Sequence, residues 1–156
     1  MESETQARLD TRHDPRLEDW HRGTIGGVLG SIAFGVLMAI QTPNVLEVAI
    51  PSLYGLEGGI AGTAVHLMHG LILGVVFAMV LTAVGWTTPK LAPSIAVGVG
   101  YGLVVWISLA AIVMPIWLAA VGFALAPDVP NITIESVFGH IAYGTVLGAV
   151  YALLGR

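Results

Sequence analysis

Two stretches of the chain are near copies of each other: HLMHGLILGVVFA at His66–Ala78 and HIAYGTVLGAVYA at His140–Ala152. Each contains a histidine, two glycines and an alanine in steps of four residues, and the copies lie 74 positions apart. Residues four apart share one face of an α-helix. The repeat therefore predicts two equivalent helices, each with a face of small residues that ends in an imidazole.

The chain around these helices has the composition of a membrane protein. Of its 156 residues, 56% are hydrophobic and 10% are charged, whereas about 25% are charged in soluble proteins. Four stretches free of Asp, Glu, Lys and Arg reach the roughly 20 residues that span a bilayer: 23–46, 58–89, 91–127 and 136–155. We expect an all-α protein with four transmembrane helices, a multi-pass protein of the cell membrane in contact with the lipid bilayer. Proline cannot donate a helix hydrogen bond, so Pro43 is expected to end the first span and Pro115 to interrupt the third.

The basic residues predict how the four spans are oriented. They lie before the first span, between the second and the third, and at the last residue, so four spans place all of them on one side. They are Arg8, Arg12, Arg16, Arg22, Lys90 and Arg156. The positive-inside rule then predicts that the N- and C-termini are cytoplasmic. We expect a polar cytoplasmic segment at 1–22 and a single transmembrane domain at 23–156.

The duplication is expected to extend over both halves of the transmembrane domain. Two glycines of the first span match two glycines of the third at a spacing of 72, and these pairs are Gly26 with Gly98 and Gly30 with Gly102. The prediction is two duplicated helical hairpins, at about 23–84 and 93–154. The apolar connector inside each hairpin is expected to lie at the outer interface or to fold back against the bundle.

Every predicted span contains two glycines four residues apart. These are Gly26 and Gly30, Gly70 and Gly74, Gly98 and Gly102, and Gly144 and Gly148. Helices in a membrane associate through close van der Waals fit, and small residues let two backbones approach each other. We therefore expect these glycines to form helix-packing seams.

Three interpretations of His66 and His140 are open. As neutral imidazoles they can donate hydrogen bonds to neighbouring helices and hold the bundle together. As ligands at equivalent depths they can bind a b-type haem, or together with His69 a copper or zinc ion. With His69, Glu57 and Glu135 they can also take part in the movement of protons or small solutes across the membrane.

Several motifs that carry catalytic or binding chemistry are absent from the sequence, and their absence narrows the range of expected functions. It contains no Walker loop, nucleophile elbow or HExxH motif, and no cysteine for a thiolate metal site. A net charge of −4 without a basic patch argues against nucleic-acid binding. We expect a non-enzymatic accessory or scaffold subunit, in a homo-oligomer or a larger membrane complex. The alternative is a membrane electron carrier that binds b-type haem or a metal through the paired histidines.

The glycine-rich helices around Gly70, Gly74, Gly144 and Gly148 resemble those of small four-helix membrane proteins of halophilic archaea. The preference for arginine over lysine and the acidic residues outside the spans agree with that resemblance. Members of the group are sometimes labelled histidine kinases, but this sequence contains no ATP-binding motif. The resemblance implies a membrane setting and brings no activity or site residue with it.

Overall fold

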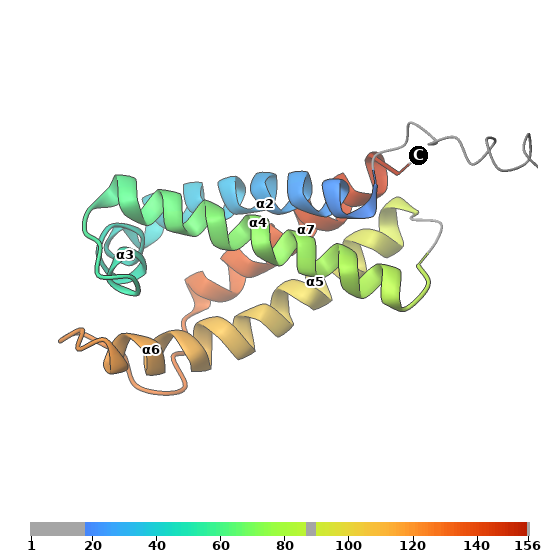
Figure 1. Cartoon of the computed structure of the whole chain (residues 1–156). Helices are drawn as coiled ribbons and strands as arrows, with labels where there is room; N and C mark the ends of the chain where they lie inside the picture. Colours follow the sequence, from blue (N-terminus) through green and yellow to red (C-terminus); the bar gives the residue numbers. More distant parts are fainter. Residues whose placement is uncertain (1–17, 87–89, 156) are drawn as a thin grey trace, which may run out of the picture.

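The computed structural model describes residues 18–86 and 90–155, and this part of the chain is helical and contains no strand (Figure 1). The predicted cytoplasmic segment lies outside the described residues up to position 17. In chain order, the helical segments are α2 (Asp19–Gln41), the π-helical η1 (Val45–Ala49), α3 (Ile50–Ser52), α4 (Gly59–Ala83), α5 (Leu91–Val105), the π-helical η2 (Trp106–Val113), α6 (Met114–Ala120) and α7 (Ile134–Leu153).

Four helices of the described residues are long and apolar enough to cross a membrane, as predicted. Three of them are α2, α4 and α7, and the fourth is the continuous helix formed by α5, η2 and α6. A bilayer offers no water to backbone N–H and C=O groups, so a spanning segment satisfies them within its own helix. The expected all-α architecture with four apolar spans is confirmed.

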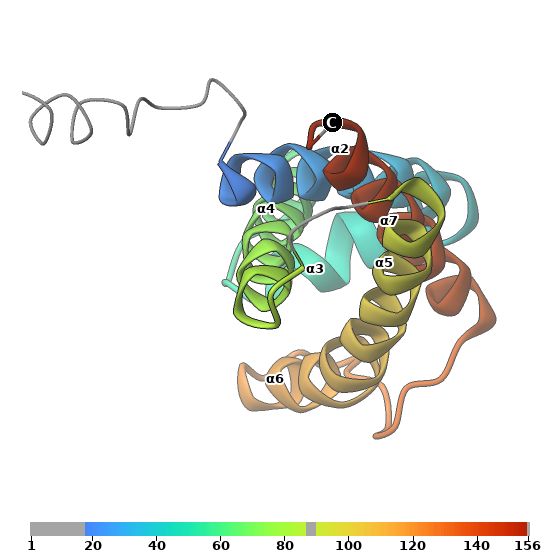
Figure 2. The same ribbon diagram turned by 90° about the vertical axis from the view of Figure 1, so that its right-hand side faces the viewer.

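The four spans form a curved row in the order α4, α2, α7, α5 (Figure 2). The long helices of each hairpin pack against each other, α2 against α4 and α5 against α7, and the two hairpins meet where α2 packs against α7. The outer members of the row, α4 and α5, face each other across its concave side (Figure 2).

A proline follows a widened helical turn in both hairpins. Pro51 is the second residue of α3, after η1, and Pro115 is the second residue of α6, after η2. Proline has no N–H for the carbonyl one turn earlier, and a π-helical turn is one way in which a helix accommodates that loss. The predicted interruption at Pro115 is therefore wrong, because the helix passes through the proline and continues to Ala120. The first span ends at Gln41, immediately before Thr42 and Pro43, as predicted.

The connectors cover the end of the bundle opposite the start of α2 and the end of α7 (Figure 1). The first connector folds back onto α4, with Leu46 and Pro51 buried against it. Gly62 of α4 makes this contact close, because a Cβ there would meet the carbonyl oxygen of Leu46. The second connector leaves α6, and the backbone N–H of Asn131 donates to the carbonyl oxygen of Ala111, 2.9 Å away. Both connectors thus lie over the half of the bundle that holds the histidines.

Candidate functional site

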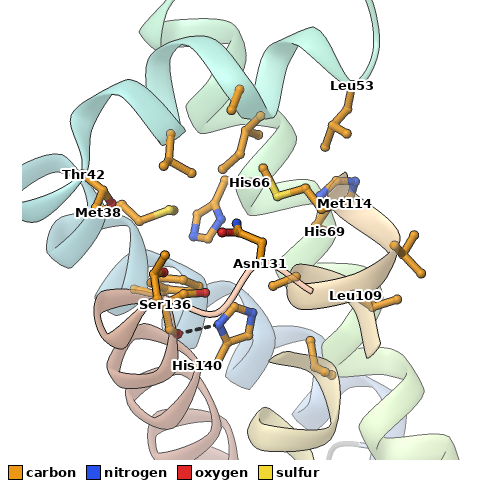
Figure 3. Close-up of a pocket in the computed structure, with 18 of the residues that line it drawn as sticks. Met38, Thr42, Leu53, His66, His69, Leu109, Met114, Asn131, Ser136 and His140 are labelled. Atoms are coloured by element: carbon orange, nitrogen blue, oxygen red, sulfur yellow. Dashed lines mark hydrogen bonds between the residues drawn. The ribbon is translucent and has the colours of Figure 1, made fainter. Parts of the chain in front are cut away.

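A cavity of about 580 Å³ lies between the two hairpins, in the half of the bundle covered by the connectors. All four spans and both connectors contribute to its lining, which is mostly apolar. Ligand sites in proteins have volumes of roughly 300–1,000 Å³ and combine an apolar lining with a few polar groups. The polar residues labelled in Figure 3 are Thr42, His66, His69, Asn131, Ser136 and His140.

His66 extends from α4 into this cavity (Figure 3). The side chain is 9% exposed, and its Nε2 lies 2.9 Å from the carbonyl oxygen of Ser31 on α2. A carbonyl oxygen only accepts, so Nε2 carries the proton and donates. In the neutral ring Nδ1 is then unprotonated and can accept a hydrogen bond or bind a metal.

His140 extends into the same cavity from α7 (Figure 3). It is also 9% exposed, and its Nδ1 donates to the carbonyl oxygen of Ser136, which lies one turn earlier at 2.8 Å. In the neutral ring this leaves Nε2 as the unprotonated nitrogen. The two histidines therefore have opposite tautomers, and each keeps one ring nitrogen without a proton.

Phe34 of α2 connects the two imidazoles. Its ring packs edge-on against His66, with centroids 5.3 Å apart, and against His140, with centroids 4.8 Å apart. Gly139 makes room for the phenyl ring, because a Cβ at that position would collide with it. Phe34 was not predicted from the sequence, where the available signal was the glycine directly before His140.

The third histidine lies at the rim of the cavity. The Nε2 atom of His69 and the hydroxyl of Tyr54, in the first connector, share a hydrogen bond of 2.7 Å. Within residues 18–86 and 90–155, no group of three or more His, Cys, Asp or Glu side chains is placed to hold a metal ion. His66, His69 and His140 form no such group there, and copper or zinc binding by a pair of them stays a prediction.

Two tyrosines bond to carbonyl groups of α4, and one of them, Tyr143, lines the cavity. Tyr143 donates from its hydroxyl to the carbonyl oxygen of Gly70, 3.0 Å away, and Tyr101 donates to that of Leu73, 2.8 Å away.

Toward the start of α2 and the end of α7, the buried ring of Phe77 packs between Tyr101 and Tyr151. This apolar packing lies in the half of the bundle where proton movement would need polar groups, so the structure adds no support for that interpretation.

The glycines of α4 bring its backbone into direct contact with the backbone of α2. A Cβ at Gly74 would meet the carbonyl oxygen of Gly23, and a Cβ at Gly27 would meet that of Gly70. The contact face of α2 toward α4 therefore contains Gly23 and Gly27. Gly26 and Gly30, the pair singled out in the sequence, instead face α7, where they meet Leu147 and Tyr143 respectively.

The second hairpin has an equivalent contact between α5 and α7. A Cβ at Gly98 would meet the carbonyl oxygen of Gly144, a Cβ at Gly102 that of His140, and a Cβ at Gly148 that of Ser94. By these contacts Gly98 corresponds to Gly27, at a spacing of 71. The predicted correspondence of Gly26 with Gly98 is off by one residue.

The cavity thus combines an apolar lining with two histidines whose free nitrogens belong to different hairpins. No protein-family model matches the chain, and neither a curated protein nor a solved structure is significantly similar to it. We therefore infer the function from the cavity itself.

Proposed function

We propose that this chain is a non-enzymatic multi-pass membrane protein that binds a small, largely apolar molecule between its two hairpins. One observation supports this most directly: the cavity of about 580 Å³ contains two buried histidines, each with one ring nitrogen that no hydrogen bond from the described residues reaches. Both nitrogens keep some accessible surface, so a molecule in the cavity that donates hydrogen bonds can bond to them.

In this proposal the two hairpins are duplicated copies that form the scaffold of the site. The support is that the same contact recurs, since Gly27 meets Gly70 in one hairpin and Gly98 meets Gly144 in the other. The proline that follows a π-helical segment, Pro51 or Pro115, also recurs. Glycine seams keep the long helices of each hairpin close, and the space between the hairpins remains for the ligand. Such a protein acts as an accessory or scaffold subunit, in a homo-oligomer or a larger membrane complex.

Tryptophan fluorescence tests whether the cavity takes a ligand. Trp117 lines it, so we would replace the other three tryptophans with phenylalanine and place the full chain in lipid nanodiscs. A brominated long-chain alcohol should quench Trp117 in a saturable manner. Ala110→Phe, which fills the cavity, should abolish the saturable part, whereas Ala119→Phe on the exposed side of α6 should retain it. Quenching that rises linearly in all three proteins would contradict a binding site.

A second candidate function is a b-type haem electron carrier, and the hydrogen bond of His140 favours it. Histidines that ligate metals commonly donate their other ring N–H to a backbone carbonyl, as His140 does to Ser136. His66 and His140 would hold the iron, and haem would supply one-electron transfer. Protein purified in mild detergent should then show a reducible Soret band that His66→Ala or His140→Ala removes. A featureless spectrum from protein expressed with added haem would exclude this candidate.

A further inference from the structure

The hydrogen bonds of the two histidines restrict which head group the cavity accepts. The proton of His66 is committed to the carbonyl of Ser31, and the proton of His140 to that of Ser136. What each neutral imidazole offers to the cavity is a lone pair, so a matching head group must donate. The lining contains no lysine or arginine among the described residues, and it includes Glu135. Carboxylate and phosphate head groups therefore find no counter-charge in the cavity, whereas hydroxyl groups find acceptors.

The position of the two acceptors further restricts the head group. The nitrogens of His66 and His140 belong to different hairpins and face one cavity, which suits a molecule with a hydroxyl at each of two ends (Figure 3). Phe34 packs edge-on against both imidazoles, so a ring placed between them lies beside an aromatic neighbour. Aromatic pairs favour such edge-to-face and offset arrangements. An aromatic ring with two opposed hydroxyls meets both conditions.

The wall between α4 and α5 provides a place for an apolar tail. These helices stand at the two ends of the curved row, and both contribute to the lining there, through Ile72 and Leu73 of α4 and Val105 of α5 (Figure 2). Ile72 and Leu109 are 49% and 39% exposed and also line the cavity, so the lining reaches the surface that faces lipid. A hydrocarbon tail can pass between the two helices into the bilayer without desolvating polar groups.

From these three features we infer that the ligand is a membrane-soluble hydroquinone, a quinol with a hydrocarbon tail. Its two hydroxyls donate to Nδ1 of His66 and Nε2 of His140, its ring lies beside Phe34, and its tail leaves between α4 and α5. This inference rests on the proposed function and specifies its ligand. The oxidised quinone carries two acceptors in place of two donors, so the site binds the reduced form more tightly.

Equilibrium binding of a quinol and its quinone tests the inference. The probes are decylubiquinol and decylubiquinone, titrated anaerobically into the full chain in nanodiscs, with Trp117 fluorescence as the readout. We expect the quinol to bind at least about tenfold more tightly than the quinone. His66→Leu and His140→Leu should each weaken quinol binding roughly three- to tenfold, which is the contribution of one hydrogen bond. Met79→Leu, on a lipid-exposed face of α4, is the matched control and should leave the affinity unchanged.

Two further measurements keep failure of folding and failure of the inference apart. His140→Asn retains a side-chain acceptor and should bind the quinol better than His140→Leu. Equal or tighter binding of the quinone, or unchanged quinol affinity in both leucine variants, overturns the inference. If the brominated alcohol binds saturably while neither probe does, the quinol is wrong and the proposed ligand site stands. If the alcohol, the quinol and the quinone all fail to saturate, the proposed function fails as well.

Discussion

The guanidinium group of Arg22 stacks on the ring of Tyr151, with its central carbon 4.0 Å from the ring centroid. The Nε–H of the same arginine donates to the backbone carbonyl of Tyr151, 3.2 Å away. Its NH1 group pairs with Asp19 at 2.5 Å, and Asp19 accepts a hydrogen bond from Thr82 at 3.2 Å. This network joins α2 to α7 and α4 at the end of the bundle opposite the cavity. It holds the spans together at that end, whereas the cavity lies at the histidine end.

Arg22→Lys should destabilise the protein although it preserves the charge. A lysine ammonium lacks the planar group that stacks on Tyr151 and the Nε–H that reaches its carbonyl. Loss of a buried charged hydrogen bond and of a cation–π contact predicts a decrease of about 1–3 kcal/mol in unfolding free energy. Titration of the purified protein with SDS measures it. The matched control is Lys90→Arg at an exposed position, which should change stability by less than about 0.5 kcal/mol.

Gly74→Ala should destabilise the first hairpin. An added Cβ at Gly74 meets the carbonyl oxygen of Gly23, a backbone atom that can move only if the helices separate. Overpacking of this kind costs about 1–3 kcal/mol, measured in the same SDS titration. Gly100→Ala is the matched control, because a Cβ there meets nothing within 4 Å. It should be neutral or slightly stabilising, since alanine favours helix more than glycine does.

The same SDS titration can show which face of α2 packs against α4. A Cβ at Gly27 would lie 2.2 Å from the carbonyl oxygen of Gly70, whereas a Cβ at Gly26 would lie 3.0 Å from Cδ1 and 3.1 Å from the carbonyl oxygen of Leu147, which needs a smaller shift. Gly27→Ala should therefore destabilise the protein more than Gly26→Ala. The reverse order would show that α2 presents a different face to α4 than the structure describes.

The two cavity histidines should have opposite tautomers. In ¹⁵N-labelled protein, long-range ¹H–¹⁵N correlations should show the proton of His140 on Nδ1 and that of His66 on Nε2, because each N–H donates to a carbonyl. Ser136→Ala is a useful control, since the acceptor is the main-chain oxygen of Ser136 and the tautomer should persist. Protonation of Nε2 in His140 would remove its free acceptor and with it the basis of the quinol inference.

The predicted topology can be tested by cysteine labelling, because the natural chain contains no cysteine. Glu57→Cys, in the exposed first connector, should react with a membrane-impermeant maleimide in intact cells. Lys90→Cys, between the second and third spans, should react only after permeabilisation, because the positive-inside rule places it in the cytoplasm. Labelling in the opposite pattern would invert the orientation.

Part of the candidate site could be predicted from the sequence, and the rest could not. The sequence identified His66 and His140 because the surrounding 13-residue stretch is repeated. It did not identify Phe34 and Tyr54, which contact histidines from a different span and from the first connector, or Asn131, which lines the same cavity from the second connector. Contacts between distant segments leave no periodic signal along the chain, so these residues emerged only from the fold.

The spans and their glycine content follow from the sequence alone. The thickness of the bilayer sets the length of each span, and the lack of water forces the backbone into helices. Which glycine contacts which helix was decided by tertiary structure. One residue is a rotation of about 100° around a helix, so Gly26 and Gly27 differ only in the neighbour they face. The free nitrogen of each histidine was also decided there, because it depends on which carbonyl lies within reach of the ring.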